Sequence, residues 1–184
     1  MFVKNVNYYD KLSFAEYLAM PGVSYSGIKG DIPASAGMSL GTNVHQYILE
    51  PEKYLWDNVS IVKPIAAALR TYLGQAINHL EKETAFTADF HYNGLVMSYK
   101  GRADLLKAGR IVVDIKVLSG SLAPSIARFG YDKQISGYCL ATSSPMGLII
   151  AFNRARKVVE HTIIKPDAAF WEYQTIQRCQ IPMA

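Results

Sequence analysis

Residues 101–116 read GRADLLKAGRIVVDIK, and this stretch sets the expected fold. It holds two runs with strand character, joined by Ala108-Gly109, a dipeptide that favours a turn. Because a tight turn makes its flanking strands neighbours, Asp104 before the turn and Asp114 after it can converge on one point. Side chains alternate along a strand, so Asp114 and Lys116 share one face. The stretch therefore predicts two carboxylates and an amine at the ends of adjacent strands.

This trio has the composition of a metal-dependent hydrolytic site. Paired carboxylates bind Mg²⁺ or Mn²⁺ through oxygen and leave positions for water and a phosphate. A bound metal lowers the pKa of its water and offsets charge at phosphorus. Lys116 can position or deprotonate the attacking water, or neutralise developing charge; nearby carboxylates favour the protonated, electrostatic role. The alternative is a solvated strand end with a surface ion pair. The apolar run Ile111–Val113 favours the metal site, because charges beside a buried strand are costly without a partner.

In the rest of the chain, segments with the hydrophobic periodicity of a helix alternate with segments that have the periodicity of a strand. Helices are expected over Ser13–Ala19, within Gly41–Tyr54, from Pro64 to about Lys82, over Ser121–Ala141 and over Pro166–Cys179; strands are expected over Ala85–Tyr92, Leu95–Leu106, Ile111–Val117, Met146–Phe152 and Val158–Ile164. Asn93-Gly94 predicts a tight hairpin turn. On the second strand, Met97, Tyr99, Ala103 and Leu105 are expected to share the face opposite Asp104. We predict an α/β fold around a central mixed β-sheet flanked by helices.

Length and composition indicate a globular protein. The 184 residues fit one domain, with residues 1–40 irregular, residues 41–164 as core and residues 165–184 as C-terminal helix. The chain contains no apolar run of about 18 residues and no apolar signal core, so we expect no membrane partner and a cytoplasmic location, in a bacterial host cell. The net charge of +4 suits a nucleic-acid partner but fits an ordinary protein equally well.

Four short elements occur in a specific order. They are the helical GTNVH ending at His45 with the following LEPEKY, the Gly-Arg-x-Asp ending at Asp104, the Asp-x-Lys ending at Lys116, and the Gln-x-x-x-Tyr of Gln134 and Tyr138. Together they resemble the PD-(D/E)XK nuclease superfamily, and more closely its exonuclease VIII (RecE) and RecB-like, phage-type branch. Many superfamily members carry proline before the first aspartate, where this chain has Ala103.

The resemblance implies a restriction-endonuclease-like core of the order αβββαβ and roles for individual residues. It implies Mg²⁺ or Mn²⁺ bound by His45, Asp104, Asp114 and the backbone carbonyl of Ile115. It also implies that Lys116 assists hydrolysis and that Gln134 and Tyr138 position the nucleic-acid strand. From the residues alone, a helical histidine is a borderline ligand for a hard metal, and Glu50 is a rival on another face of the helix. Candidates for backbone phosphate contacts are Lys100, Arg102, Arg128 and Lys133, with surface solubility as the alternative.

The function implied by the resemblance is a DNA exonuclease acting 5′→3′ on linear duplex ends in phage or prophage recombination. Such relatives form homo-oligomeric rings and hand their product to a single-strand annealing protein, so both are expected partners. Two alternatives stay open: a structure-specific DNA endonuclease of the same fold, and a non-catalytic DNA-binding or assembly protein that retains the fold.

Overall fold

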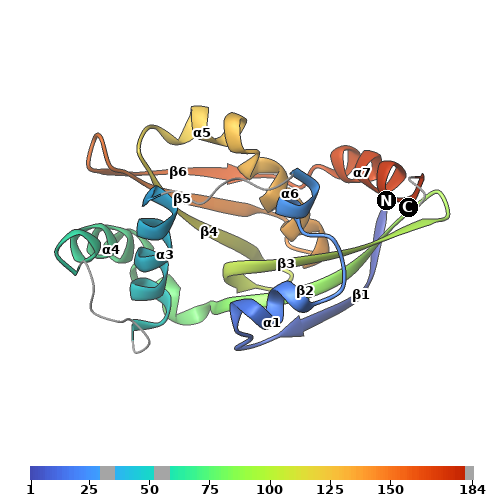
Figure 1. Cartoon of the computed structure of the whole chain (residues 1–184), viewed down its shortest axis with the longest axis horizontal. Helices are drawn as coiled ribbons and strands as arrows, with labels where there is room; N and C mark the ends of the chain where they lie inside the picture. Colours follow the sequence, from blue (N-terminus) through green and yellow to red (C-terminus); the bar gives the residue numbers. More distant parts are fainter. Residues whose placement is uncertain (30–35, 52–58, 181–184) are drawn as a thin grey trace.

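The computed structural model describes residues 1–29, 36–51 and 59–180, and these form a six-stranded sheet with helices on both faces (Figure 1). The strands lie in chain order across the sheet, and all neighbours are antiparallel except β4 and β5, which are parallel. Their bounds are β1 Phe2–Tyr9, β2 Glu81–Tyr92, β3 Leu95–Lys107, β4 Ile111–Leu118, β5 Gly147–Asn153 and β6 Val158–Ile164. The predicted mixed α/β fold is confirmed.

Along the chain, helices lie before, between and after the strands. Their bounds are α1 Phe14–Ala19, α2 Tyr25–Lys29, α3 Ala36–Leu49, α4 Val59–Leu73, the 3₁₀ helix η2 Gly74–His79, α5 Leu122–Phe129, α6 Tyr131–Ala141 and α7 Ala168–Gln180. None of the helices in the described residues is long and apolar enough to cross a membrane.

Each face of the sheet carries its own apolar core. On one face, α6 and α7 pack against β2 and β3, with Trp171, Tyr99 and Tyr138 among the buried rings. On the other face, α3 and α4 pack against β4 and β5 around Ile48 and Leu69. Burial of this apolar area supplies most of the driving force for folding. The sheet therefore separates α3 from α6, and any site that uses both helices must lie where the sheet opens.

The sheet opens between β3 and β4. Their ladder covers only the residues next to the turn, pairing Leu105–Lys107 with Ile111–Val113. Beyond it β3 stays with β2 and β4 stays with β5, so the strands part at Asp104 and Asp114. The alternation of side chains between the two faces of β3 also changes at this point. Ala103 packs into the core on one face of the sheet, and Leu105 packs into the core on the other face. The expectation that these two side chains share a face was wrong, since strict alternation assumes an uninterrupted ladder.

Other expectations fail where long-range pairing decides the structure. The described part of residues 1–40 is not irregular: Phe2–Tyr9 forms the edge strand β1, which pairs with β2 through a register shift near Asn5. That bulge removes the regular alternation that would have marked a strand. The single helix expected over Ser121–Ala141 is divided into α5 and α6 at Gly130, which adopts a positive φ of 65°.

The helix expected from Pro64 begins earlier than this proline suggests. Val59–Leu73 forms α4 with Pro64 inside it, and a 3₁₀ segment replaces its expected last turn. The helix that carries His45 ends at Leu49, and residues 52–54 of the expected Gly41–Tyr54 segment lie outside the described residues. The Asn93-Gly94 turn is confirmed, with both residues at positive φ.

Candidate metal and catalytic site

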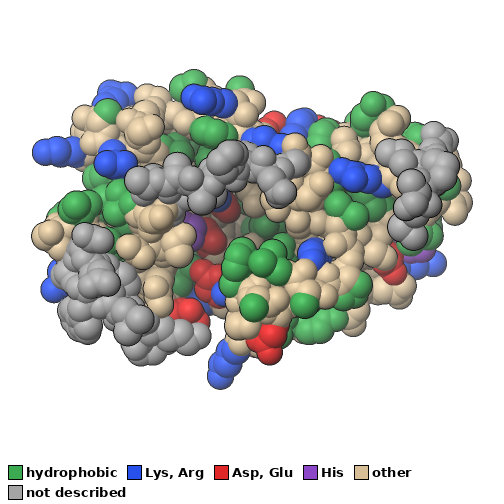
Figure 2. Space-filling model, viewed as in Figure 1, with side chains coloured by type: hydrophobic (Ala, Val, Ile, Leu, Met, Phe, Trp, Pro, Cys, Tyr) green, Lys and Arg blue, Asp and Glu red, His purple; other side chains and the backbone are tan. Residues whose placement is uncertain are grey.

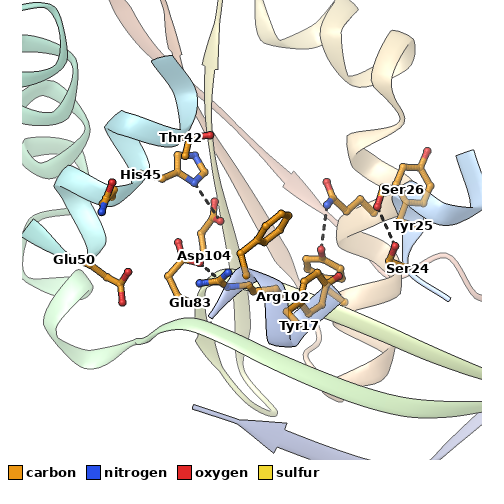
Figure 3. Close-up of a pocket in the computed structure, with 14 residues that line it drawn as sticks. Tyr17, Ser24, Tyr25, Ser26, Thr42, His45, Glu50, Glu83, Arg102 and Asp104 are labelled. Carbon is orange, nitrogen blue, oxygen red and sulfur yellow. Dashed lines mark hydrogen bonds and ion pairs between the residues drawn. The ribbon is translucent and has the colours of Figure 1, made fainter. Parts of the chain in front are cut away.

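Asp104 lies at the point where β3 and β4 separate, and its carboxylate bridges the opening. The backbone N–H of Ile115 donates to Asp104 Oδ2 at 2.6 Å. A side-chain oxygen thus replaces the backbone acceptor that a continuing ladder would have supplied. On α3, His45 contributes Nε2, at 2.6 Å from the carbonyl oxygen of Ile115, and Nδ1, at 3.4 Å from Asp104 Oδ1. Figure 3 shows the imidazole directed toward this carboxylate.

Glu83 completes this group from the neighbouring strand β2. One potential ligand atom from each of His45, Glu83 and Asp104 lies within 4.8 Å of the other two. An imidazole with two carboxylates is a donor set that divalent cations such as Mg²⁺ and Mn²⁺ accept. The residues present therefore fit a bound divalent metal. Glu50 lies on the same pocket but outside this group of three.

Sequence reasoning missed Glu83, although one signal pointed to it. The two-residue turn at Asn93-Gly94 fixes the β2–β3 register. Lys82 pairs with Leu105 and Thr84 pairs with Ala103, so Glu83 lies opposite Asp104. Glu83 has a positive φ of 51°, a conformation uncommon outside glycine. Counting the register back from the turn would have placed a second carboxylate at the site.

The charges in this cluster perturb one another. Burial raises the pKa of Glu83 to about 7, and the charge of Asp104 adds to the effect, while Arg102 opposes it with its Nε 2.8 Å from Glu83 Oε2. Burial also acts to raise the pKa of Asp104, but His45 and the N–H of Ile115 outweigh it, so that pKa falls. Burial lowers the pKa of His45, yet the Asp104 carboxylate raises it more, and the net direction is upward. Two close carboxylates repel each other when both are ionised, and a bound cation would stabilise this doubly charged state.

Asp114 and Lys116 form an ion pair beside this group. Lys116 Nζ lies 2.8 Å from Asp114 Oδ1 and 2.7 Å from Oδ2, which confirms that the two side chains share a face of β4. The ammonium also lies 5.1 Å from the ring centre of Tyr131 on α6. Burial lowers the pKa of Lys116, but Asp114 and Asp104 raise it more. The amine is therefore held in its charged form, and both aspartates lie within its electrostatic reach.

The four ligands expected from sequence are thus brought together only in part. His45, Asp104 and the carbonyl of Ile115 meet as expected, whereas both oxygens of Asp114 contact Lys116. Among the described residues, the group of three potential ligands contains Glu83 and not Asp114. The structure therefore adds Glu83 to the candidate metal ligands.

A pocket of about 450 Å³ extends from the metal-ligand group toward α1, α2 and α6. Figure 2 shows the molecule hollowed at its centre, with acidic and histidine side chains visible inside. The amide of Gln134 donates to Tyr138 Oη at 3.1 Å, and both residues line the pocket, so the expected shared helical face is confirmed. The lining residues are Phe14, Tyr17, Ser24, Tyr25, Ser26, Thr42, His45, Gln46, Glu50, Glu83, Arg102, Asp104, Gln134 and Tyr138.

The four basic residues expected to contact phosphate have different surroundings. Arg102 lines the pocket, as such a contact requires. Lys133 is paired with Asp167 at 2.6 Å, and Arg128 is exposed over the ring of Phe129.

Lys100 does not fit the expected role. Only 8% of its surface is exposed, and its Nζ donates to the backbone carbonyls of Tyr17, Leu18 and Met20. The expectation of a phosphate contact at Lys100 was wrong, because the sequence did not show that α1 would cover this strand.

Comparison with known proteins agrees with this geometry. Residues 66–163, just over half of the chain, match the family model of the PD-(D/E)XK nuclease superfamily. The chain belongs to this superfamily. It is therefore a nuclease, of a superfamily that uses divalent metals, and the group of His45, Glu83 and Asp104 fits that chemistry. The matched range includes Asp104, Asp114 and Lys116, while His45 precedes it.

Several solved structures are similar in fold. A protein from Eubacterium rectale assigned as an exonuclease is 16% identical, with a TM-score of 0.52 over 91% of this chain and 73% of that chain. An alkaline exonuclease from Laribacter hongkongensis is 15% identical, with a TM-score of 0.44 over 82% of this chain and 70% of that chain. A phage-related exonuclease from Haemophilus somnus 129PT is 13% identical, with a TM-score of 0.37 over 90% and 88%. A search of the curated proteins found no match.

Proposed function

We propose that this nuclease is a DNA exonuclease that hydrolyses phosphodiester bonds with Mg²⁺ or Mn²⁺, acting 5′→3′ on linear duplex ends in phage-type recombination. The observation that carries the proposal is that His45, Glu83 and Asp104 bring potential ligand atoms within 4.8 Å of one another. They do so where β3 and β4 separate, beside the pocket. DNA as substrate and exonuclease action follow the four-motif resemblance, and the name of the similarly folded Eubacterium rectale protein agrees with exonuclease action.

The cation would be held by His45, Glu83, Asp104 and the carbonyl of Ile115, with Asp114 as a further proposed ligand beside them. When bound, a divalent cation supplies Lewis acidity and a water of lowered pKa. The protein holds these donor groups on three parts of the fold: α3, β2 and the point where β3 and β4 separate. Because Asp104 is fixed by the Ile115 N–H, its second oxygen keeps its direction toward His45.

The remaining residues act on the nucleic acid. The charged amine of Lys116, fixed by Asp114, lies where it can neutralise negative charge that develops at the reacting phosphate. Gln134 and Tyr138 offer an amide and a hydroxyl to the strand from the opposite side of the pocket. Arg102 reaches the same pocket, and a phosphate would compete with Glu83 for its guanidinium.

The test uses linear duplex DNA labelled at either its 5′ or its 3′ ends, together with a circular duplex of the same sequence. With Mg²⁺ or Mn²⁺ the wild-type protein should release nucleotides from linear DNA, from the 5′ side, and leave the circle intact. Asp104→Ala, Glu83→Gln and Lys116→Met should abolish release. Glu81→Gln is the matched control, because Glu81 lies on the same strand but is exposed.

Each alternative has its own outcome. Cleavage of the circle would favour a structure-specific endonuclease. DNA binding without cleavage, unchanged by metal, would favour a non-catalytic DNA-binding protein. Wild-type rates in Asp104→Ala or Lys116→Met would overturn the proposed site.

A further inference from the structure

Helix α1 places an exposed aromatic ring on the rim of the pocket. Phe14 is 62% exposed and also lines the pocket. Its ring centre lies 6.1 Å from that of Tyr17, which is buried on the pocket side of the same helix. One side of the Phe14 ring is therefore supported by protein, and much of the rest is open to solvent or a ligand.

Two sets of contacts hold the helix that carries this ring. At its start, α1 has a complete capping box in which Ser13 and Glu16 satisfy each other's backbone N–H groups. At its end, Lys100 Nζ donates to the carbonyls of Leu18 at 2.8 Å and Met20 at 2.6 Å, and reaches that of Tyr17 at 3.4 Å. A helix of six residues is unstable alone. The buried Lys100, on the same strand as Arg102 and Asp104, ties α1 to the candidate site.

The pocket between α1 and the metal-ligand group combines apolar rings with polar groups. The rings come from Phe14, Tyr17, Tyr25 and Tyr138, and the polar groups from Ser24, Ser26, Arg102 and Gln134. Figure 3 shows Arg102 between the acidic group and Tyr17. Its volume of about 450 Å³ is in the range of pockets that enclose one small organic ligand, ~300–1,000 Å³. A flat ring with hydrogen-bonding edges, attached to a phosphate, matches this mixture.

We propose that Phe14 is a positioning residue that stacks on the unpaired base of the terminal nucleotide, so that the preferred substrate is a DNA end with a single-stranded terminus. The inference rests on the proposed nuclease action on DNA and names its substrate class. A base inside a duplex has both faces covered by its neighbours, and a terminal base pair exposes only its outer face, whereas an unpaired base can leave the stack and enter the pocket beside Phe14. Stacking on an aromatic side chain accepts any base, which suits an enzyme that advances along a strand.

The experiment measures stacking and affinity separately. A duplex with a single-stranded overhang carries the fluorescent base 2-aminopurine at its terminus, and binding is measured with Ca²⁺ in place of Mg²⁺ so that the DNA stays intact. The proteins are wild type, Phe14→Ala, the conservative Phe14→Trp, and Leu18→Ala. Leu18 is the matched control because it is 57% exposed on the same helix but does not line the pocket.

Wild type, Phe14→Trp and Leu18→Ala should quench the fluorophore and bind the overhang alike. Phe14→Ala should lose the quench and weaken binding by between about 5-fold and about 150-fold, the range for loss of one stacked base. Quenching and affinity equal to wild type in Phe14→Ala would overturn the inference. So would an effect confined to the oligomeric mass of the protein, which would assign Phe14 to a contact between copies.

The outcome also separates this inference from the proposed function. If wild type degrades linear DNA with Mg²⁺ and Phe14→Ala matches it in every measurement, only the stacking role fails. If wild type neither binds nor degrades DNA, the proposed function fails and the stacking role fails with it.

Discussion

Replacement of Asp104 by asparagine or alanine should separate its two roles, holding the strands and binding metal. The N–H of Ile115 is buried and donates to Asp104 Oδ2 at 2.6 Å. Asparagine keeps an oxygen acceptor at this place but loses the charge. Alanine removes both and leaves the N–H without its acceptor, which costs about 1–3 kcal/mol. In a chain of this size each kcal/mol corresponds to ~2–4 °C in Tm.

Thermal unfolding followed by circular dichroism, with EDTA and then with excess Mn²⁺, measures both roles. In EDTA, Asp104→Ala should unfold roughly 2–12 °C below wild type, and Asp104→Asn should stay close to wild type. Added metal should raise the Tm of wild type, because a ligand that binds only the folded state stabilises it. Neither variant should respond, since each leaves Glu83 as the one carboxylate of the group of three.

Two results would refute this reasoning. An Asp104→Ala protein as stable as wild type in EDTA would show that the contact with Ile115 does not hold the strands. A full metal-induced rise in Tm for Asp104→Asn would show that Asp104 is not a ligand.

Three further substitutions test the surroundings of the site. Gly101→Ala should lower the free energy of unfolding by about 1–3 kcal/mol, measured in urea, because a Cβ there would overlap aromatic rings including that of Tyr138; retained stability and activity would contradict this. Lys100→Met should lower stability by about 1–3 kcal/mol and make α1 sensitive to protease, since three carbonyls lose their donor; unchanged proteolysis would argue against the anchor. The hydrogen bond from Lys133 lowers the pKa of Asp167 in the folded state. The ionised carboxylate therefore stabilises the folded protein at pH values above its unfolded pKa of about 3.9. This stabilisation is lost as the pH falls through the pKa that Asp167 has in the folded state. The Tm difference between wild type and Asp167→Asn should accordingly be present at neutral pH and vanish in acid, and a difference that persists in acid would assign it to another cause.

Much of the site could be predicted because its parts are local in the sequence. The turn between the two strands brings Asp104 near Asp114, and a two-residue spacing joins Asp114 to Lys116. A four-residue spacing along one helix aligns Gln134 with Tyr138. Each of these relations depends only on a short turn or on the period of one strand or helix, which a short stretch of residues determines.

Relations that depend on distant partners needed the tertiary structure. Glu83 was missed because it becomes a candidate ligand through the strand register that sets it opposite Asp104; its immediate neighbours give no sign of this, and the turn at Asn93-Gly94 that fixes the register lies ten residues away. The sequence pattern at Lys100 is typical of a surface residue, yet α1 covers this side chain, and carbonyl groups at the end of α1 accept hydrogen bonds from its ammonium group. Strand β1 was missed because it is an edge strand with a bulge and gains its order from pairing with β2.

The sequence by itself determined most strands, the approximate places of most helices, and the nuclease chemistry that the chain carries. The tertiary structure alone decided which charged groups meet and which are used for packing. The physical reason is that periodicity is a property of neighbouring residues, whereas the fate of a buried charge depends on the element that packs over it and on the partners that element supplies.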